Sequence, residues 1–238
     1  SPNRFGSKTR IMILPKNYLK RLELEQLFDL AKFVVNENFK HHTSSIYPEN
    51  YENDISSIFQ EEMLYFKNAG IFVSKDEDNS IIGSIRVLRW NYKDILPIQK
   101  IFGINPLLLN GYDINKSIWH IGRFAIKKGV KDINLFKRLM VCAIAPICQD
   151  KNAVAYAECD SKLLRVMLAL GIKATPVDKP INYLGSETIP VSMRYKDLIG
   201  FYNKNKSLVP VDFLTSTMNS ELPKRVVSPV HQYNYSLV

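Results

Sequence analysis

The chain has 238 residues, of which 46% are hydrophobic and 23% charged, a composition that excludes global disorder and a fibrous repeat. Its length suits one domain with a full core. A net charge of +9 indicates an anionic partner, which charge alone leaves open among nucleic acid, a membrane surface, an acidic carrier protein and a phosphate-bearing cofactor.

The first part of the sequence predicts two amphipathic helices. Apolar residues from Leu24 to Val35 recur at steps of three and four, and we expect a helix over about Leu19 to Phe39. A polar loop that contains Pro48 follows. The next apolar positions begin at Ile55 and predict a second helix that ends near Gly70.

A hairpin and an excursion come next. Ile71 to Ser74 and Ile81 to Trp90 are rich in β-branched residues, and the cluster from Asp76 to Ser80 between them is typical of a turn. The stretch from Asn91 to Ser117 holds prolines and glycines among apolar clusters, so we expect an excursion from the sheet with some short helix. It carries specificity contacts or is a packed surface insert.

The sequence then alternates between strands and helices. Ile118 to Lys127 predicts a strand, and the apolar stripe from Phe136 to Ile147 predicts a helix that Pro146 should end or bend. Ala153 to Cys159 predicts the next strand. A short helix should follow, with Ser161 as its N-cap and Gly171 after its last turn.

The last expected strands are Ala174 to Val177 and Ile189 to Tyr195, separated by a loop. The periodicity fades beyond Gly200. We therefore expect a folded domain over residues 1–200 and, over residues 201–238, a tail that packs on the domain or is mobile.

Location and cysteine chemistry follow from the same reading. No stretch reaches the ~20 consecutive apolar residues of a membrane-spanning helix, and Ser1 to Arg10 lacks the apolar core of a secretory signal, so we expect a cytoplasmic protein. Cys142, Cys148 and Cys159 have neither CxxC spacing nor a nearby histidine partner. We expect free thiols and no metal site.

Three blocks of the sequence resemble the acyl-homoserine-lactone synthases. Gly83 to Leu88, GSIRVL, is similar to their Gly-x-x-Arg-Leu block on the strand before the insert. Trp119 to Ile126, WHIGRFAI, is similar to their next strand, in which an aromatic residue and Glu precede Ser/Thr-Arg-Phe; here His120 stands in place of that Glu. Leu163 to Gly171 resembles the helix after their fifth strand.

This resemblance, over about residues 24–198, implies an α/β fold of the GNAT type. In that fold a mixed central sheet is flanked by helices, and two neighbouring middle strands splay apart to hold the pantetheine arm of an acyl donor. The strands that begin at Ile118 and Ala153 would be that pair. The resemblance implies a bacterial N-acyltransferase of the autoinducer-synthase type, and the His120 replacement favours the related N-acyl-amino-acid synthases.

The donor implied by the resemblance is acyl carrier protein, with no bound cofactor. Acetyl-CoA-dependent GNAT enzymes use a glycine-rich loop for the pyrophosphate, and no glycine lies between Val130 and Arg138 here. The synthases share this departure and accept the acyl chain from the acyl-phosphopantetheine of the carrier. The alternative is an N-acyltransferase of the same fold that takes the acyl chain from acyl-CoA and transfers it to another amine.

His120 and Glu158 are the candidate catalytic residues. Amide formation from a thioester needs a group that accepts the proton of the amine, and imidazole titrates close to neutral pH. The alternative is that His120 has a structural role, with its hydrogen bonds satisfied inside the sheet. Glu158 acts as base or as amine-binding anion, or it pairs with Arg123 or Arg86, because a buried carboxylate needs a partner.

Four residues are candidates for substrate binding: Arg86, Arg123, Phe124 and Ile126. The two arginines fall within apolar strands and must find an anion, which is the carboxylate of the acceptor or Glu158. Strict alternation places His120 and Arg123 on opposite faces of the strand. A shared site therefore requires a bulge near Gly122.

A basic face is predicted at the start of the helix after this strand. Lys131, Asn134 and Arg138 share one face at helical spacing, with Lys127 and Lys128 just before them. They form a cradle for the pantetheine phosphate and a docking patch for an acidic carrier protein, or simply a solvated helix face.

Two further alternatives stay open. The cluster from Ile101 to Leu109, with Met140, Met167 and Leu168, lines an apolar tunnel for the acyl chain or belongs to the core. A non-catalytic module that binds nucleic acid or membrane would need a continuous basic stripe with exposed aromatics, whereas the basic residues here are scattered. We therefore expect as partners a carrier protein and a small amine or amino acid, no nucleic acid, and membrane contact only through the lipid product.

Overall fold

The computed structural model of the chain describes residues 17–42, 50–111, 113, 115–183 and 186–215. The N-terminal segment Ser1 to Arg10, the loop around Pro48 and residues 216–238 of the expected tail lie outside these residues. In the described part no helix is long and apolar enough to cross a membrane.

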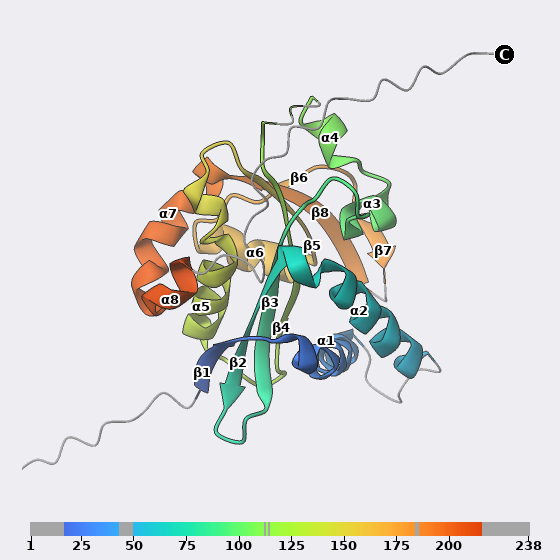
Figure 1. Cartoon of the computed structure of the whole chain (residues 1–238), viewed down its shortest axis with the longest axis vertical. Coiled ribbons are helices and arrows are strands. Elements are labelled where there is room, and N and C mark those ends of the chain that lie inside the picture. The colour runs from blue at the N-terminus through green and yellow to red at the C-terminus, as the bar shows by residue number, and fades with distance from the viewer. Residues whose placement is uncertain (1–16, 43–49, 112, 114, 184–185, 216–238) are drawn as a thin grey trace, which may run out of the picture.

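A mixed sheet of eight strands forms the centre of the molecule (Figure 1). The strands are β1 (Asn17–Arg21), β2 (Ala69–Asp76), β3 (Ile81–Arg89), β4 (Ile118–Ile126), β5 (Val154–Cys159), β6 (Thr175–Pro176), β7 (Ile181–Tyr183) and β8 (Ser186–Arg194). They follow the order β1-β2-β3-β4-β5-β8-β6, and β7 also pairs with β8. The β4–β5 pair is parallel and the other pairs are antiparallel.

Helices cover both faces of this sheet. They are α1 (Leu27–His42), α2 (Tyr51–Tyr65), α3 (Pro97–Phe102), α4 (Pro106–Leu109), α5 (Ile133–Ile144), α6 (Ser161–Ala169), α7 (Tyr195–Asn205) and α8 (Val211–Thr215). Short 3-10 turns are η1 (Leu24–Gln26), η2 (Phe66–Asn68), η3 (Ile147–Gln149) and η4 (Lys206–Leu208). In Figure 1, α5 and α7 lie on one side of the sheet and α1 and α2 on the other.

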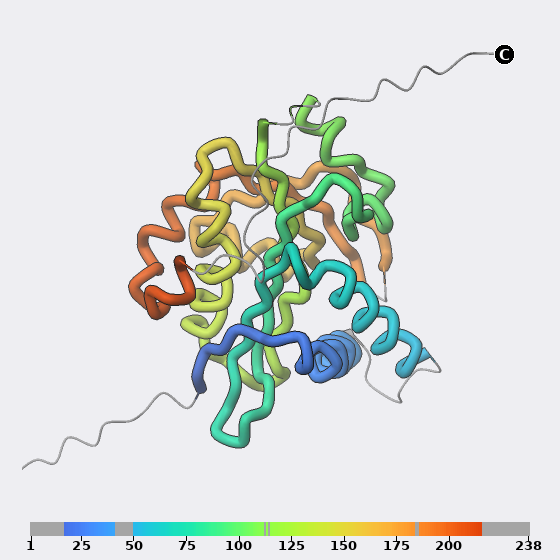
Figure 2. The backbone as a smooth tube through the Cα atoms, in the orientation of Figure 1, coloured from blue at the N-terminus to red at the C-terminus, as the bar shows by residue number. Residues whose placement is uncertain are grey.

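Alternation along the strands separates two apolar layers. Side chains such as Ile85 and Val87 meet Leu139 of α5 in the main core, whereas Ile71 and Val73 meet α1 on the opposite face. The excursion after β3 holds the two short helices α3 and α4, as expected, and Figure 2 follows the chain through it to the start of β4. Apolar residues of this insert pack over Tyr156 in a separate cluster.

Many sequence predictions are confirmed. The hairpin of β2 and β3 turns between Asp76 and Ser80, and the main-chain N–H of Asp76 donates to the carbonyl of Ser80 at 3.0 Å. α5 ends at Ile144, just before Pro146. Gly171 follows α6 with a φ of +90°, a conformation that glycine adopts without a steric penalty. The three cysteines are free thiols.

The start of the chain was predicted wrongly. The segment from Leu19 to Arg21 belongs to strand β1 rather than to the first helix, because it pairs with the open edge of β2, where Leu19 lies opposite Ser74. The helix proper begins at Leu27. Pairing with a sheet edge outweighs the helical preference of so short a segment.

Three later elements also differ from the prediction. Asp160 rather than Ser161 is the N-cap of α6, and its carboxylate accepts the N–H of Leu163 at 2.7 Å. β8 begins at Ser186, and the expected loop before it contains β7. The chain continues past β8 as α7, which runs beyond Gly200 to Asn205, and its buried Leu198 and Phe201 pack on the core.

Candidate active site between β4 and β5

β4 and β5 run side by side for only part of their length. Their parallel ladder joins Ile118–Ile121 to Val154–Ala157 and ends there. Beyond it, Gly122–Ile126 stays paired with β3, while Glu158 and Cys159 pair with β8. Burial follows the same boundary, because the first four residues of β4 are buried and the last five are only half-buried. The expected splay of the two middle strands is therefore confirmed, and we call it the β4–β5 split.

A β-bulge lies at the point where the strands part. Ser84 lies opposite Ala125 and Arg86 opposite Gly122, so that two residues of β4 face Ile85 alone. Arg123, in the bulge, has a φ of +53°, and the hydroxyl of Ser84 donates to its carbonyl at 2.7 Å. Left-handed backbone costs a non-glycine residue about 1–2 kcal/mol. The bulge near Gly122 is confirmed, with Arg123 in the strained position.

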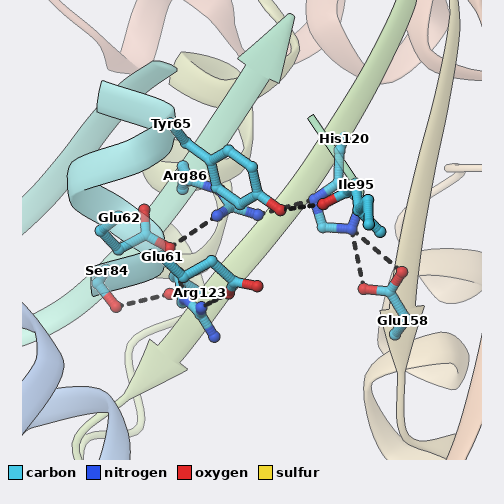
Figure 3. Close-up of polar contacts among 9 residues, drawn as sticks. All are labelled: Glu61, Glu62, Tyr65, Ser84, Arg86, Ile95, His120, Arg123 and Glu158. Carbon is cyan, nitrogen blue, oxygen red and sulfur yellow. Dashed lines mark hydrogen bonds and ion pairs between the residues drawn. The ribbon is translucent and has the colours of Figure 1, made fainter. Parts of the chain in front are cut away.

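The bulge brings four predicted residues into one polar network (Figure 3). His120 Nε2 lies 2.9 Å from the Glu158 carboxylate, across the β4–β5 split. His120 Nδ1 lies 2.9 Å from Nη2 of Arg86, and Nη1 of Arg86 donates to Glu62 Oε1 at 2.7 Å. Arg123 Nε donates to the same oxygen at 2.7 Å. A chain of contacts thus runs from Glu158 to Arg123.

The inner part of this network is almost fully shielded from water. The exposed fractions are 0% for Glu62 and 1% for both Arg86 and His120. Burial acts to raise the pKa of Glu62, but Arg86 and Arg123 outweigh it and hold that pKa below its ordinary value. Glu62 is therefore a carboxylate held by two guanidinium groups.

Charge in the network is not fully balanced. Arg123 also pairs through Nη2 with Glu61, and burial, which acts to lower its pKa, is outweighed by the carboxylates of Glu62 and Glu61. Two arginines therefore face two glutamates on α2. Glu158 is the additional carboxylate, and its side chain is 11% exposed. The accessible end of the network is negative.

Glu158 contacts His120 and neither arginine, so the alternative in which it pairs with Arg123 or Arg86 is not what the structure shows. The arginines pair instead with glutamates of α2, because that helix lies over this face of the sheet and places Glu62 beside them. Arg86 is further enclosed by Tyr65, whose ring centroid lies 4.9 Å from the guanidinium carbon. The hydroxyl of Tyr65 donates to the carbonyl of Ile95 in the insert.

The other substrate-binding candidates lie on the part of β4 past Ile121, which pairs with β3 but not with β5. Phe124 packs edge-on against Phe136 of α5, with ring centroids 5.2 Å apart. Ile126 packs against the same main core. Of the expected tunnel residues, Met140 and Met167 are buried in that core, whereas Leu168 is half exposed.

The basic candidates follow the end of β4, and three of them have partners within the protein. Lys127 lies 3.9 Å from Asp76, and the ammonium of Lys128 donates to a carbonyl of α1 at 2.7 Å. Arg138 donates to Asn17 at 2.6 Å. Lys131 and Asn134 remain exposed at the start of α5. Only part of the expected cradle is thus free to meet a phosphate.

The sequence analysis missed the acidic residues of α2. Glu62 occupies a position between Phe59 and Phe66 in the apolar stripe of that helix, and a carboxylate on such a stripe is a signal of a buried ion pair. Tyr183 of β7 was also missed. Burial and then Glu61 raise its pKa, and Glu158 and Arg123 also act on it, so its phenol lies near the network and stays protonated.

Two hollows lie away from the dyad of His120 and Glu158. A cavity of about 280 Å³ lies between α1 and the β2–β3 turn, beside Phe33 and Lys75. A second, of about 160 Å³, lies at the opposite end of β5 beside Arg194. No group of His, Cys, Asp and Glu in the described part of the chain has the arrangement of a metal site.

Solved structures share this architecture. FeeM, an N-acyl amino acid synthase from uncultured soil microbes, superposes with a TM-score of 0.54 at 14% identity over 82% of this chain and 99% of its own. TofI in a ternary complex with an inhibitor and MTA gives 0.53 at 13% identity over 79% and 96%. No family model and no curated protein matches the sequence.

At these identities the likeness is one of fold. The chain has the mixed sheet of FeeM and TofI, and the expected GNAT-like α/β architecture is confirmed. The resemblance to acyl-homoserine-lactone and N-acyl-amino-acid synthases, drawn from three sequence blocks, agrees with these structures.

Proposed function

We propose that this protein is an N-acyltransferase. It moves a fatty acyl chain from the phosphopantetheine thioester of acyl carrier protein to the amine of an amino acid or a related small acceptor. The observation that carries the proposal is the β4–β5 split, with the dyad of His120 and Glu158 across the end where the strands part. The name of FeeM, an N-acyl amino acid synthase of the same fold, supports the choice of acceptor.

The β4–β5 split leaves one edge of β4 without a neighbouring strand, and an arm that resembles a peptide can bind there in place of that strand. Past Ile121, the edge of β4 that faces β5 has no strand beside it, although it lies in the middle of the sheet. The pantetheine arm contains two amide groups, and an extended amide chain can add to a free strand edge through main-chain hydrogen bonds. Binding there brings the thioester toward Glu158.

Direct transfer suits the groups at this point. The amine attacks the thioester carbonyl, and a nearby base must accept its proton while N–H donors stabilise the oxyanion. The dyad supplies the proton acceptor, and the donors would be main-chain N–H groups of β4 past Ile121, where the ladder to β5 has ended. No covalent acyl-enzyme is needed, and the cysteines suit none, since burial raises the pKa of Cys159 to about 12.

Both helix starts near the split favour a carrier-protein donor over acyl-CoA. Asp132 caps α5 and accepts the N–H of Asn134 at 2.8 Å, and Asp160 caps α6 in the same way. An aspartate at a helix N-terminus takes the place that a diphosphate would occupy and repels it. The exposed Lys131 beside α5 meets the single phosphate of a carrier arm and the acidic surface of the carrier.

Mass spectrometry of lipid extracts tests this function. Bacterial cells expressing the protein should accumulate new N-acyl amino acids or N-acyl amines, and cells with the His120→Ala and Glu158→Ala variants should not. In a second step the purified protein is given the same acyl chain on carrier protein or on CoA. Faster amide formation from the carrier supports the proposed donor, whereas the absence of any acylated amine would refute the function.

A further inference from the structure

The contacts of His120 fix the position of its proton. Nδ1 lies 2.9 Å from a guanidinium nitrogen of Arg86, and a guanidinium group can only donate hydrogen bonds. Nδ1 must therefore be the bare, accepting nitrogen. In neutral imidazole the proton then lies on Nε2, where it donates to Glu158 at 2.9 Å. Both nitrogens of His120 are thus committed inside the protein.

Glu158 is the member of the pair that a substrate can reach. Its side chain is 11% exposed, compared with 1% for His120. It follows Ala157, the last residue of the β4–β5 ladder, so it lies where the two strands begin to part. An ionised carboxylate has about four lone-pair positions, so Glu158 can hold His120 and still accept from an amine.

The rest of the network holds His120 in this orientation. Arg86 reaches Nδ1 because Glu62 binds its other terminal nitrogen at 2.7 Å, and Glu62 is in turn shared with Arg123. In the described structure Glu62 Oε2 and Arg86 Nε have no hydrogen-bond partner, so the arrangement leaves two buried polar atoms unsatisfied. A network built only for stability would satisfy these atoms or replace them with apolar groups.

We propose that Glu158 binds the amine of the acceptor and takes its proton, and that His120, Arg86 and Glu62 are positioning residues. This inference rests on the acyl transfer proposed above. The nitrogen lone pair forms the C–N bond while the carbonyl π pair moves to oxygen, and the proton of the amine passes to Glu158. Collapse reforms the carbonyl and breaks the C–S bond, and the departing thiolate takes that proton, which restores the carboxylate.

The activity test compares matched substitutions with a decanoyl carrier protein as donor and an amino acid mixture as acceptor. Glu158→Gln should lower turnover by about 10²–10⁴-fold, the usual contribution of a general base. His120→Gln should stay within about 10-fold of the unaltered protein, because its amide can donate to Glu158 and accept from Arg86 as imidazole does. His120→Ala, which keeps neither bond, should lose more. Glu187→Gln, an exposed carboxylate on β8, is the control for the loss of one charge.

A second readout does not depend on turnover. Spectra of protein with ¹⁵N-labelled histidine should show His120, assigned among the four histidines by its loss in His120→Gln, with a bare Nδ1 and a proton on Nε2. Arg86→Met, which removes the donor that faces Nδ1 and keeps most of the side-chain volume, should mix the two tautomers. A proton on Nδ1 in the unaltered protein, or an active Glu158→Gln variant, would overturn the inference alone. No transfer by the unaltered protein would overturn the proposed function as well.

Discussion

Gly122→Ala adds a single methyl group beside the network and changes no group that takes part in the reaction. An added Cβ would lie 2.9 Å from Nη2 of Arg86 and 3.1 Å from Cε1 of His120. Both side chains are buried and tied to partners, so Arg86 must move off His120 or β4 must shift. Overpacking of this kind costs about 1–3 kcal/mol, or roughly 2–4 °C in melting temperature for each kcal/mol in a chain of this size.

The same displacement should impair the reaction. Without Arg86 at Nδ1, His120 is free to turn or to change tautomer, and misplacement of about 1 Å near reacting groups costs up to ~10²-fold in rate. Gly83→Ala is the matched control, because its Cβ would lie 2.9 Å from Leu139 in the core on the other face of the sheet. Both variants should melt at lower temperature, but only Gly122→Ala should lose turnover per folded molecule. Equal turnover in the two variants would refute the link between Arg86 and catalysis.

Three other predictions follow from the charges and thiols. Because the pKa of Glu62 is held below its ordinary 4.5, this carboxylate stabilises the folded state above that pH, and the stabilisation is lost as the pH falls through the lowered pKa. Urea titrations should therefore show that Glu62→Gln loses less stability on acidification than the unaltered protein. An equal dependence of the unfolding free energy on pH in the two proteins would contradict this. At neutral pH the same variant should be less stable by about 3–5 kcal/mol, since it leaves a buried arginine without its anion. Burial raises the pKa of all three cysteines to about 12. Iodoacetamide at pH 8, with labelling followed by mass spectrometry, should therefore modify them only after unfolding. Rapid labelling of the folded protein would show that the thiols are not buried. Lys131→Glu should raise the KM for the carrier protein several-fold, whereas Lys151→Glu, at the opposite end of β5, should not.

The elements predicted best are those whose periodicity is reinforced by local turn chemistry. The β2–β3 hairpin combines β-branched strands with an Asp-rich turn, and the end of α5 is fixed by Pro146. β1 was missed because its five residues carry no pattern of their own and become a strand only by pairing with β2. α7 was missed although Leu198 and Phe201 have helical spacing, because the prolines further on suggested a tail.

The candidate site was predicted only in part, because local pattern places residues on neighbouring strands but not on the helix that covers them. His120, Arg86, Arg123 and Glu158 lie on three adjacent strands, and strand parity together with a bulge was enough to bring them together. The glutamates that complete the network lie on α2. Which helix covers a given sheet face depends on tertiary packing rather than on local pattern, so Glu62 could not be assigned to Arg86 from the sequence. Without that glutamate, pairing of Glu158 with one of the arginines stayed an open alternative at the level of the sequence.

The central claim is that the β4–β5 split holds a pantetheine arm with its acyl carbon beside Glu158. A crystal structure with decanoyl-pantetheine in which an amide replaces the thioester tests it most directly. We expect the arm to extend along Gly122–Ile126 and to bond to its main chain, with the acyl carbonyl within reach of an amine held by Glu158. An arm bound elsewhere, or a β4–β5 ladder that closes past Ile121, would contradict the account.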